Sequence, residues 1–160
     1  MRCLFVAALT LSAGVAAAQD APPKDASHAI VATPDKVTWG PAPPALPPGA
    51  KLAVLEGNPS ETGPYTMRLL MPDRYRIPPH YHPFTEHVTV MKGTFKVGMG
   101  EKFDASAMTQ LPTGTFAALE PGTRHFAEAQ GETIPQLHGV GPWGLTYVNP
   151  ADDPRKRTPY

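Results

Sequence analysis

From Ala50 onward, short runs of apolar and β-branched residues alternate with turn residues that contain glycine or proline. The runs at 51–55 and 65–71 are two examples, and each is followed by a turn with a proline. Further strands are expected at 86–91, 94–99, 116–119, 125–129, 134–140 and 145–148, with the first two of these joined as a hairpin across 92–93. No window longer than about ten residues has helical periodicity. Regularly spaced short strands predict an all-β sandwich or barrel over residues 49–150.

The segment before this region, residues 19–48, is rich in proline. Proline-rich chain favours an extended conformation without internal hydrogen bonds. Val37 and Trp39 alternate with polar neighbours, as in a short strand. We expect disorder up to about Thr33 and an arm docked on the barrel from about Asp35, with a flexible linker as the alternative. Residues 151–160 are expected to form a polar, solvated tail.

Composition narrows the class of protein further. A length of 160 residues favours a single domain. The 21 prolines argue against a helical bundle, because proline inside a helix costs about 3 kcal/mol. The 14 Lys and Arg residues balance 14 Asp and Glu residues, and no block of like charges occurs. The chain therefore lacks the electrostatic character of a nucleic-acid-binding protein.

Residues 1–18 have the pattern of a secretory signal peptide. A positive start at Arg2 precedes an apolar run, and three alanines ending at Ala18 offer a cleavage site. The apolar run is shorter than the roughly 20 residues that span a membrane. We therefore expect a periplasmic or secreted protein that has no membrane association after cleavage. Cys3, the one cysteine, is lost with the signal, so we expect no disulfide.

Three histidines and a glutamate stand out by their spacing. His80 and His82 lie two residues apart, so on an extended chain they point to the same face. Glu86 begins the next apolar strand, and His125 follows a Pro-Gly turn at the start of a later one. A single histidine is most simply a hydrogen-bonded core residue, but a set with this spacing requires another explanation.

This spacing resembles the first sequence motif of the cupin superfamily. That motif ends in His-x-His, three or four residues, Glu, six residues and Gly. His80, His82, Glu86 and Gly93 meet every one of these spacings.

The second cupin motif is matched by Gly114, Gly122 and His125. The resemblance implies a jelly-roll barrel, also called a double-stranded β-helix, in a single domain. It also implies one divalent transition metal, held near the barrel mouth by the three histidines and Glu86. The chain departs from the two motifs at positions that are not metal ligands: Arg74, Glu120 and Ala129.

The chemistry of these side chains is compatible with that expectation. Three neutral imidazoles and one carboxylate suit Fe, Mn, Co, Ni, Cu or Zn. Four protein ligands leave about two positions open on an octahedral ion, where a small-molecule ligand can bind. The alternative is that ordinary hydrogen bonds satisfy all four side chains.

Other polar residues are weaker candidates for contact with a ligand. The strand after the second motif could line the pocket, and strand parity places Tyr81, Arg124 and His87 away from the metal. Trp143 lies among glycines and is expected to close one end of the barrel. The candidates for contact with the substrate or with the metal ligands are His138, Gln136, Tyr75 and Arg68.

Two functions follow from the resemblance. The first is a metal-dependent enzyme of oxygenase, decarboxylase or isomerase type. The second is a binding or sensing module without turnover, because Val37-x-Trp39 and residues 52–57 resemble the cupin half of some anti-sigma factors, where a cupin binds zinc. No sigma-binding domain accompanies them, so direct sigma control is not expected. A storage role, as in seed-storage cupins, is disfavoured because those proteins have two cupin domains.

The sequence also bears on which metal is bound and on the oligomeric state. The signal carries no twin-arginine pair, so the chain should be exported unfolded and filled with metal outside the cytoplasm. Zinc or copper is then favoured over iron, manganese, nickel or cobalt. We also expect a homodimer in which residues 35–48 lie along the edge strand of a partner.

Overall fold

A computed structural model of the chain describes residues 29–156. The predicted signal peptide, the first part of the proline-rich arm and the last four residues lie outside the described residues. Within them, no helix is long and apolar enough to cross a membrane. The nine strands of the described part are β1 (Gly40–Pro41), β2 (Lys51–Glu56), β3 (Gly63–Leu70), β4 (Arg76–Tyr81), β5 (Glu86–Met99), β6 (Thr109–Pro112), β7 (Phe116–Leu119), β8 (His125–Gly141) and β9 (Thr146–Tyr147).

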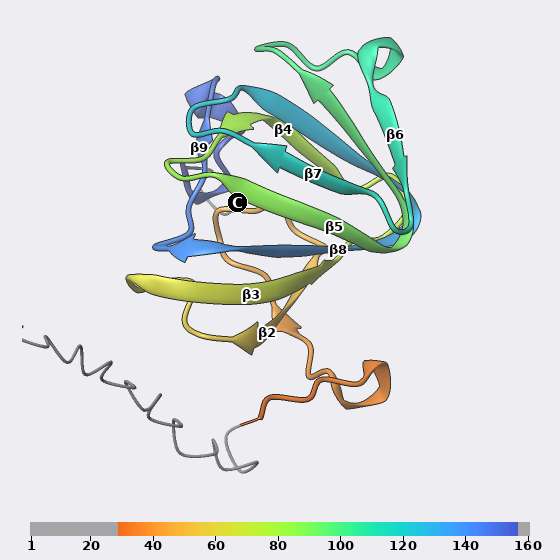
Figure 1. Cartoon of the computed structure of the whole chain (residues 1–160). Coiled ribbons are helices and arrows are strands. Elements are labelled where there is room, and N and C mark those ends of the chain that lie inside the picture. Colours follow the sequence, from red (N-terminus) through yellow and green to blue (C-terminus); the bar gives the residue numbers. More distant parts are fainter. Residues whose placement is uncertain (1–28, 157–160) are drawn as a thin grey trace, which may run out of the picture.

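Two long strands, β5 and β8, organise the molecule. They pair antiparallel along nearly their whole lengths, from His87 opposite His138 to Met99 opposite His125. At one end of this ribbon β3 pairs with β8 and β7 pairs with β5, while at the other end β4 pairs with β8 and β6 pairs with β5. The ribbon therefore belongs to both layers, and the sheet curls around an interior (Figure 1). This is the all-β jelly roll that the sequence predicts.

The ribbon bends where glycine permits it. Gly93 has φ +76°, and a Cβ at that position would lie 2.5 Å from the carbonyl oxygen of Glu132. The register between β5 and β8 shifts on both sides of Lys92. Across the bend, the buried hydroxyl of Thr133 donates to the carbonyl of Thr94 at 3.2 Å. The bend lets one pair of strands pass from one layer to the other.

The prediction of a hairpin across residues 92–93 is therefore wrong. Both of its predicted arms belong to β5, and each pairs with β8 instead of with the other arm. The strands expected at 125–129 and 134–140 likewise form one strand, β8, because Gly131 (φ +71°) bends the chain without ending the strand. A glycine in a β-bulge and a glycine in a tight turn look alike in the sequence.

Strand β4 was not among the expected strands, and it contains Pro78 and Pro79. Proline has no N–H to donate to a neighbouring strand. The register of β4 against β8 is accordingly interrupted between Ile77 and His80. Strand β6 was also not expected. The strand expected at 37–39 is not formed, and the two-residue strand β1 follows directly after it.

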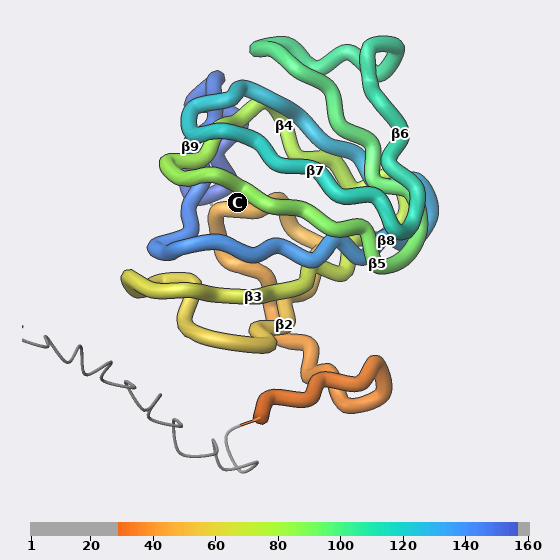
Figure 2. The backbone as a smooth tube through the Cα atoms, viewed as in Figure 1, coloured from red at the N-terminus to blue at the C-terminus, as the bar shows by residue number. Residues whose placement is uncertain are grey.

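The segment before β2 packs on the barrel of its own chain. Ala45 and Leu46 are buried in the core, and β1 pairs with β2. The hydroxyl of Tyr147, in β9, donates to the carbonyl of Ala45 at 2.8 Å. Figure 2 traces this segment from the outside of β2 towards the C-terminal residues. The proline-rich chain thus closes one side of the interior.

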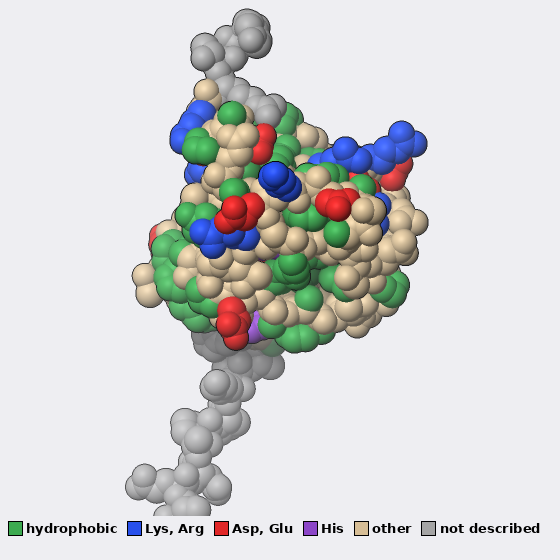
Figure 3. Space-filling model, turned by 90° about the horizontal axis from the view of Figure 1, so that it is seen from above, with side chains coloured by type: hydrophobic (Ala, Val, Ile, Leu, Met, Phe, Trp, Pro, Cys, Tyr) green, Lys and Arg blue, Asp and Glu red, His purple; other side chains and the backbone are tan. Residues whose placement is uncertain are grey.

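The outer surface carries charges of both signs. On the face in Figure 3, basic and acidic side chains are interspersed among apolar and neutral ones, as the balanced composition predicts. One mixed cluster lies on the outside of the β4–β8–β5 layer, where Glu128 forms ion pairs with both Arg76 and Lys96. Glu128 is itself buried, so its carboxylate is largely shielded from water, whereas the side chain of Arg76 is 57% exposed.

Candidate metal centre

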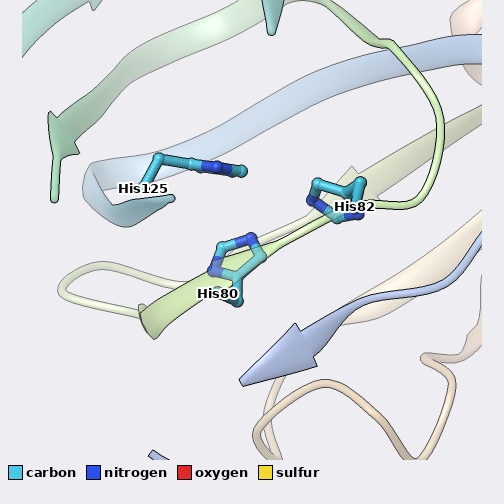
Figure 4. Close-up of side chains that lie close together, drawn as sticks. All are labelled: His80, His82 and His125. Atoms are coloured by element: carbon cyan, nitrogen blue, oxygen red, sulfur yellow. The ribbon is translucent and has the colours of Figure 1, made fainter. Parts of the chain in front are cut away.

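Three histidines from separate parts of the chain meet inside the barrel. His80 lies in β4 and is paired in the ladder with His125, the first residue of β8. His82 follows the end of β4. The three rings point towards one another (Figure 4), and one nitrogen from each lies within 4.8 Å of the others. All three side chains are at most 6% exposed.

Backbone carbonyls hold the Nδ1 atom of each of these imidazoles. His80 Nδ1 lies 2.7 Å from the carbonyl oxygen of Pro78, and His125 Nδ1 lies 2.9 Å from that of Thr123. His82 Nδ1 lies 2.7 Å from the carbonyl oxygen of Gly144. A carbonyl only accepts, so each Nδ1 must carry the proton and donate it. In each neutral ring the Nε2 lone pair is then free for a metal ion, the usual arrangement of metal-binding histidines.

The sequence did not point to these three carbonyls. Those of Pro78 and Thr123 each precede their histidine by two residues, a spacing visible in the sequence but not diagnostic. The carbonyl of Gly144 is 62 residues from His82 and is brought to it only by the fold.

Glu86 provides a carboxylate beside the histidines. Its Oε1 lies 3.4 Å from Nε2 of His82, and its Oε2 lies 3.6 Å from Nε2 of His125. His82 Nε2 is buried and has no hydrogen-bond partner among the described residues. A buried polar atom without a partner is costly in a folded protein. Coordination of an ion would satisfy it, and the donor set of three imidazoles and one carboxylate fits a divalent transition metal.

The electrostatics of the site favour the protonation states that a metal requires. Burial, followed by the proximity of His125 and His82, lowers the pKa of His80 to about 3. This imidazole is therefore neutral at neutral pH. Burial alone would raise the pKa of Glu86, but positive charge among the histidines, first at His82 and then at His125, outweighs it and lowers that pKa. With the imidazoles neutral, a bound metal ion would supply that charge. The carboxyl group is therefore ionised.

The four side chains line a narrow cavity that is otherwise apolar. The cavity volume is about 20 Å³, which is room for an ion or a water molecule. Leu46 from the N-terminal segment and Phe95 from β5 are among its walls. Trp143 also lines it, with its ring centroid 6.0 Å from that of His82, and its buried Nε1 has no hydrogen-bond partner among the described residues.

The structure places the remaining candidate residues elsewhere. Gln136 and Arg68 face each other across β8 and β3, and Arg68 Nε donates to Gln136 Oε1 at 3.0 Å. The hydroxyl of Tyr75 donates to the carbonyl of Pro47 and so anchors the N-terminal segment. His138 alternates with Leu137, which lines the cavity, so its side chain points to the outer face. None of these four residues lines the cavity of the histidine cluster.

Residues expected to point away from the centre have partners outside it. His87 stacks on His138 with ring centroids 4.8 Å apart and an interplanar angle of 9°. Arg124 lies 5.4 Å from the ring centroid of Tyr81 and forms an ion pair with Glu101 at 2.8 Å.

Several solved structures share this architecture. The polyketide cyclase RemF from Streptomyces resistomycificus is 13% identical over 78% of this chain and 88% of its own, with a TM-score of 0.62. A proposed acetylacetone dioxygenase from Methylibium petroleiphilum PM1 is 23% identical over 75% of this chain and 81% of its own, with a TM-score of 0.56. An RmlC-like cupin from Shewanella frigidimarina is 14% identical over 68% of this chain and 87% of its own, with a TM-score of 0.52. At these identities the likeness concerns the fold alone.

The sequence also matches one family directly. The profile of the ChrR cupin-like domain matches residues 27–142, which is most of the chain. No curated protein matches the sequence. The chain belongs to the ChrR cupin-like family of the cupin superfamily, as the two sequence motifs indicate.

Proposed function

We propose that this protein is an exported metal-dependent cupin enzyme that acts on a small molecule by oxygenase, decarboxylase or isomerase chemistry. One observation carries the proposal. All three Nδ1 atoms are occupied by backbone carbonyls, which leaves three Nε2 lone pairs converging beside an ionised carboxylate. Such an arrangement suits a metal ion better than it suits a network of hydrogen bonds.

His80, His82, His125 and Glu86 would hold the ion. When bound, a divalent transition metal supplies a Lewis acid, and a redox-active one also supplies electrons for oxidation. The rest of the site belongs to the chain. Apolar walls exclude bulk water, which strengthens electrostatic interactions with a bound ligand. The Nε1–H of Trp143, which has no partner among the described residues, is available to donate to a ligand oxygen.

A sensing role is the second candidate. It is supported by the match to the ChrR cupin-like family and by the resemblance of residues 37–39 and 52–57 to the cupin half of anti-sigma factors. Metal binding without turnover would be sufficient for that role, and zinc would be adequate for it. Fold alone does not choose between the two functions.

Export bears on the choice of metal. If residues 1–18 direct the unfolded chain out of the cytoplasm, the site fills where the cell does not control metal supply. Affinity then favours copper and zinc over manganese and iron. We therefore propose zinc or copper in the exported protein, and iron, manganese or nickel when the chain without residues 1–18 is produced in the cytoplasm.

Elemental analysis of both preparations tests the metal assignment. Zinc or copper in the exported protein is the expected result, and iron or manganese there would overturn the argument from export. Oxygen uptake and product formation on a panel of small molecules then test the enzyme proposal. No turnover by protein loaded in turn with zinc, copper, iron and manganese would favour the sensing role.

A further inference from the structure

A second cavity opens between β5, β6 and β7. Its cavity volume is about 310 Å³. Its walls are almost entirely aliphatic and aromatic, and Thr109 is the only polar residue among the described residues that line it. We call this space the apolar chamber.

The apolar chamber adjoins the metal centre. Phe95 lines both cavities. Leu119, in the chamber wall, lies opposite Glu86 in the pairing of β5 with β7. Val97, also in the wall, lies opposite Ala127, which lines the metal cavity. The two spaces are thus neighbouring parts of one barrel interior, with Phe95 where they meet.

The chamber has a buried floor and an open mouth. Val88, Val97 and Leu119 in its floor are each at most 6% exposed. The exposed residues around its mouth are Met99, Ala107, Thr109 and Ala118. Its volume lies at the lower end of the range of roughly 300–1,000 Å³ that is typical of small-molecule sites. Apolar walls without a filling group lose dispersion contacts, and a hydrocarbon group would restore them.

We propose that the apolar chamber binds the hydrocarbon part of a small amphipathic ligand, whose polar group approaches the metal centre past Phe95. The position of the ligand's polar group at the metal rests on the proposed metal-dependent function. The binding of its hydrocarbon part rests on the chamber alone, so either claim can be wrong while the other holds.

Calorimetric titration of the protein lacking residues 1–18 tests the proposal. The probes are 1-octanol and the straight-chain carboxylates from acetate to decanoate, added to zinc-loaded and to chelator-treated protein. Carboxylate affinity should rise about fourfold per methylene until the chamber is full, because each buried methylene contributes about 0.8 kcal/mol. Octanol should bind equally with and without zinc, whereas octanoate should bind more tightly with zinc.

Two variants fill the chamber from different sides. Ala117→Leu narrows its wall, and Ala107→Leu narrows its exposed rim, where folding is not at risk. Both should lower octanol affinity about tenfold or more, since a leucine side chain displaces two or more methylenes of the probe. The matched control is Ala151→Leu, at an exposed position in the short 3-10 helix Pro150–Asp152, which should leave octanol affinity unchanged.

Each outcome has a distinct meaning. Loss of octanol binding in both variants, with zinc-dependent octanoate binding in the wild type, supports the full proposal. The same loss with zinc-independent octanoate binding supports the chamber and overturns the link to the metal. Affinity that does not depend on chain length, or wild-type octanol binding in both variants, overturns the chamber. If the Ala107→Leu variant binds octanol normally but changes oligomeric state, the mouth of the chamber is a contact between copies of the chain. That result would also overturn the proposal that the chamber binds a ligand.

Discussion

Each histidine of the cluster has one ring nitrogen committed to a backbone carbonyl and the other directed into a buried space. His82 makes the consequence plain, because its Nε2 is buried and has no hydrogen-bond partner in the described part of the chain. A buried nitrogen without a partner is costly, and here two further imidazole nitrogens and a carboxylate converge on the same place, so that one ion would satisfy all of them. At the scale of single residues, the site is therefore best understood as a set of ligands.

We expect His80→Ala, His82→Ala and His125→Ala each to weaken metal binding by more than about 100-fold. Even changes to groups that only orient metal ligands cost about 10–100-fold. Glu86→Gln should also weaken binding, because it removes the single negative charge of the set. Metal content after dialysis and titration with zinc measure these effects.

The outer-face histidines provide the control for those variants. His87→Ala and His138→Ala remove imidazoles that stack on each other away from the cluster, so metal binding should be unchanged. Full metal occupancy in any two of the cluster variants would contradict the assignment of the ligands.

Glu128 should make the stability of the barrel depend on pH. The hydrogen bond from Lys96, then that from Arg76, lowers the pKa of Glu128 against the effect of burial. A lowered pKa in the folded state means that this carboxylate stabilises the fold above its ordinary pKa near 4.5, and that the contribution is lost as the pH falls through the folded-state value.

Glu128→Gln should therefore lower the free energy of unfolding by about 2 kcal/mol at pH 7, and by much less at pH 3. Urea denaturation at the two pH values measures this difference. Glu132→Gln is the matched control, since the ion pair of Glu132 with Lys92 is exposed and should contribute little. An equal loss for Glu128→Gln at both pH values would contradict the electrostatic explanation.

At the scale of elements, the bend in the β5–β8 ribbon positions the site. Glu86 and His125 begin β5 and β8, and each strand runs from its ligand through the bend into the other layer. The bend requires glycine at 93, because φ is positive there and a Cβ would meet the carbonyl oxygen of Glu132. The Gly of the first cupin motif is thus a requirement of backbone geometry.

Gly93→Ala should destabilise the fold by at least about 1–2 kcal/mol, which is the cost of a left-handed conformation for a residue with a Cβ. The steric conflict with Glu132 adds to this cost. Thermal melting measures the effect. Gly40→Ala is the control, because Gly40 lacks a positive φ and a Cβ there would meet its nearest atom at 3.9 Å. Equal melting of the two variants would show that the bend tolerates a side chain.

At the scale of the whole molecule, a bound ion would tie together segments that are far apart in the chain. The predicted ligands come from β4, from the loop after it, and from the starts of β5 and β8. An ion bound only by the folded state adds about 2.7 kcal/mol of stability at 100 times its dissociation constant. Removal of metal by a chelator should therefore lower the melting temperature by about 10 °C, and re-addition should restore it. A variant with all three cluster histidines changed to alanine is the control and should not respond to the chelator.

We also expect the protein lacking residues 1–18 to be a homodimer. The N-terminal segment from β1 onward packs on its own barrel, whereas Ile30 and Val31 before it are 64% and 76% exposed. The expectation that residues 35–48 lie along the edge strand of a partner is therefore wrong for β1, which occupies the edge of its own β2. Ile30 and Val31 are exposed apolar side chains that remain for contact with a partner. Light scattering should report a dimer for the wild type and a monomer for the double variant Ile30→Ser, Val31→Ser. Val140→Ser, at an exposed position on the barrel, is the control, and an unchanged dimer in the double variant would remove the arm from this role.

The sequence by itself was sufficient for the features that depend on local pattern. Alternating strands, the spacing of His80 and His82, and the two cupin motifs predicted the barrel and placed three histidines in one site. These predictions succeeded because strand periodicity decides which face a side chain occupies. The signal peptide, the dimer and the native metal remain predictions.

Only the tertiary structure decided which strands are continuous and which polar residues reach the interior. The sequence pattern predicts turns at Gly93 and Gly131, but the long-range pairing of β5 with β8 makes them bends within continuous strands. His138 lies on the strand that lines the cavity but points outward, because the register of β8 assigns the inner face to Leu137. The carbonyl of Gly144 reaches His82, and the apolar chamber forms, through contacts between residues distant in the sequence. Local pattern sets the face of a strand, whereas register and partner depend on the packing of the whole chain.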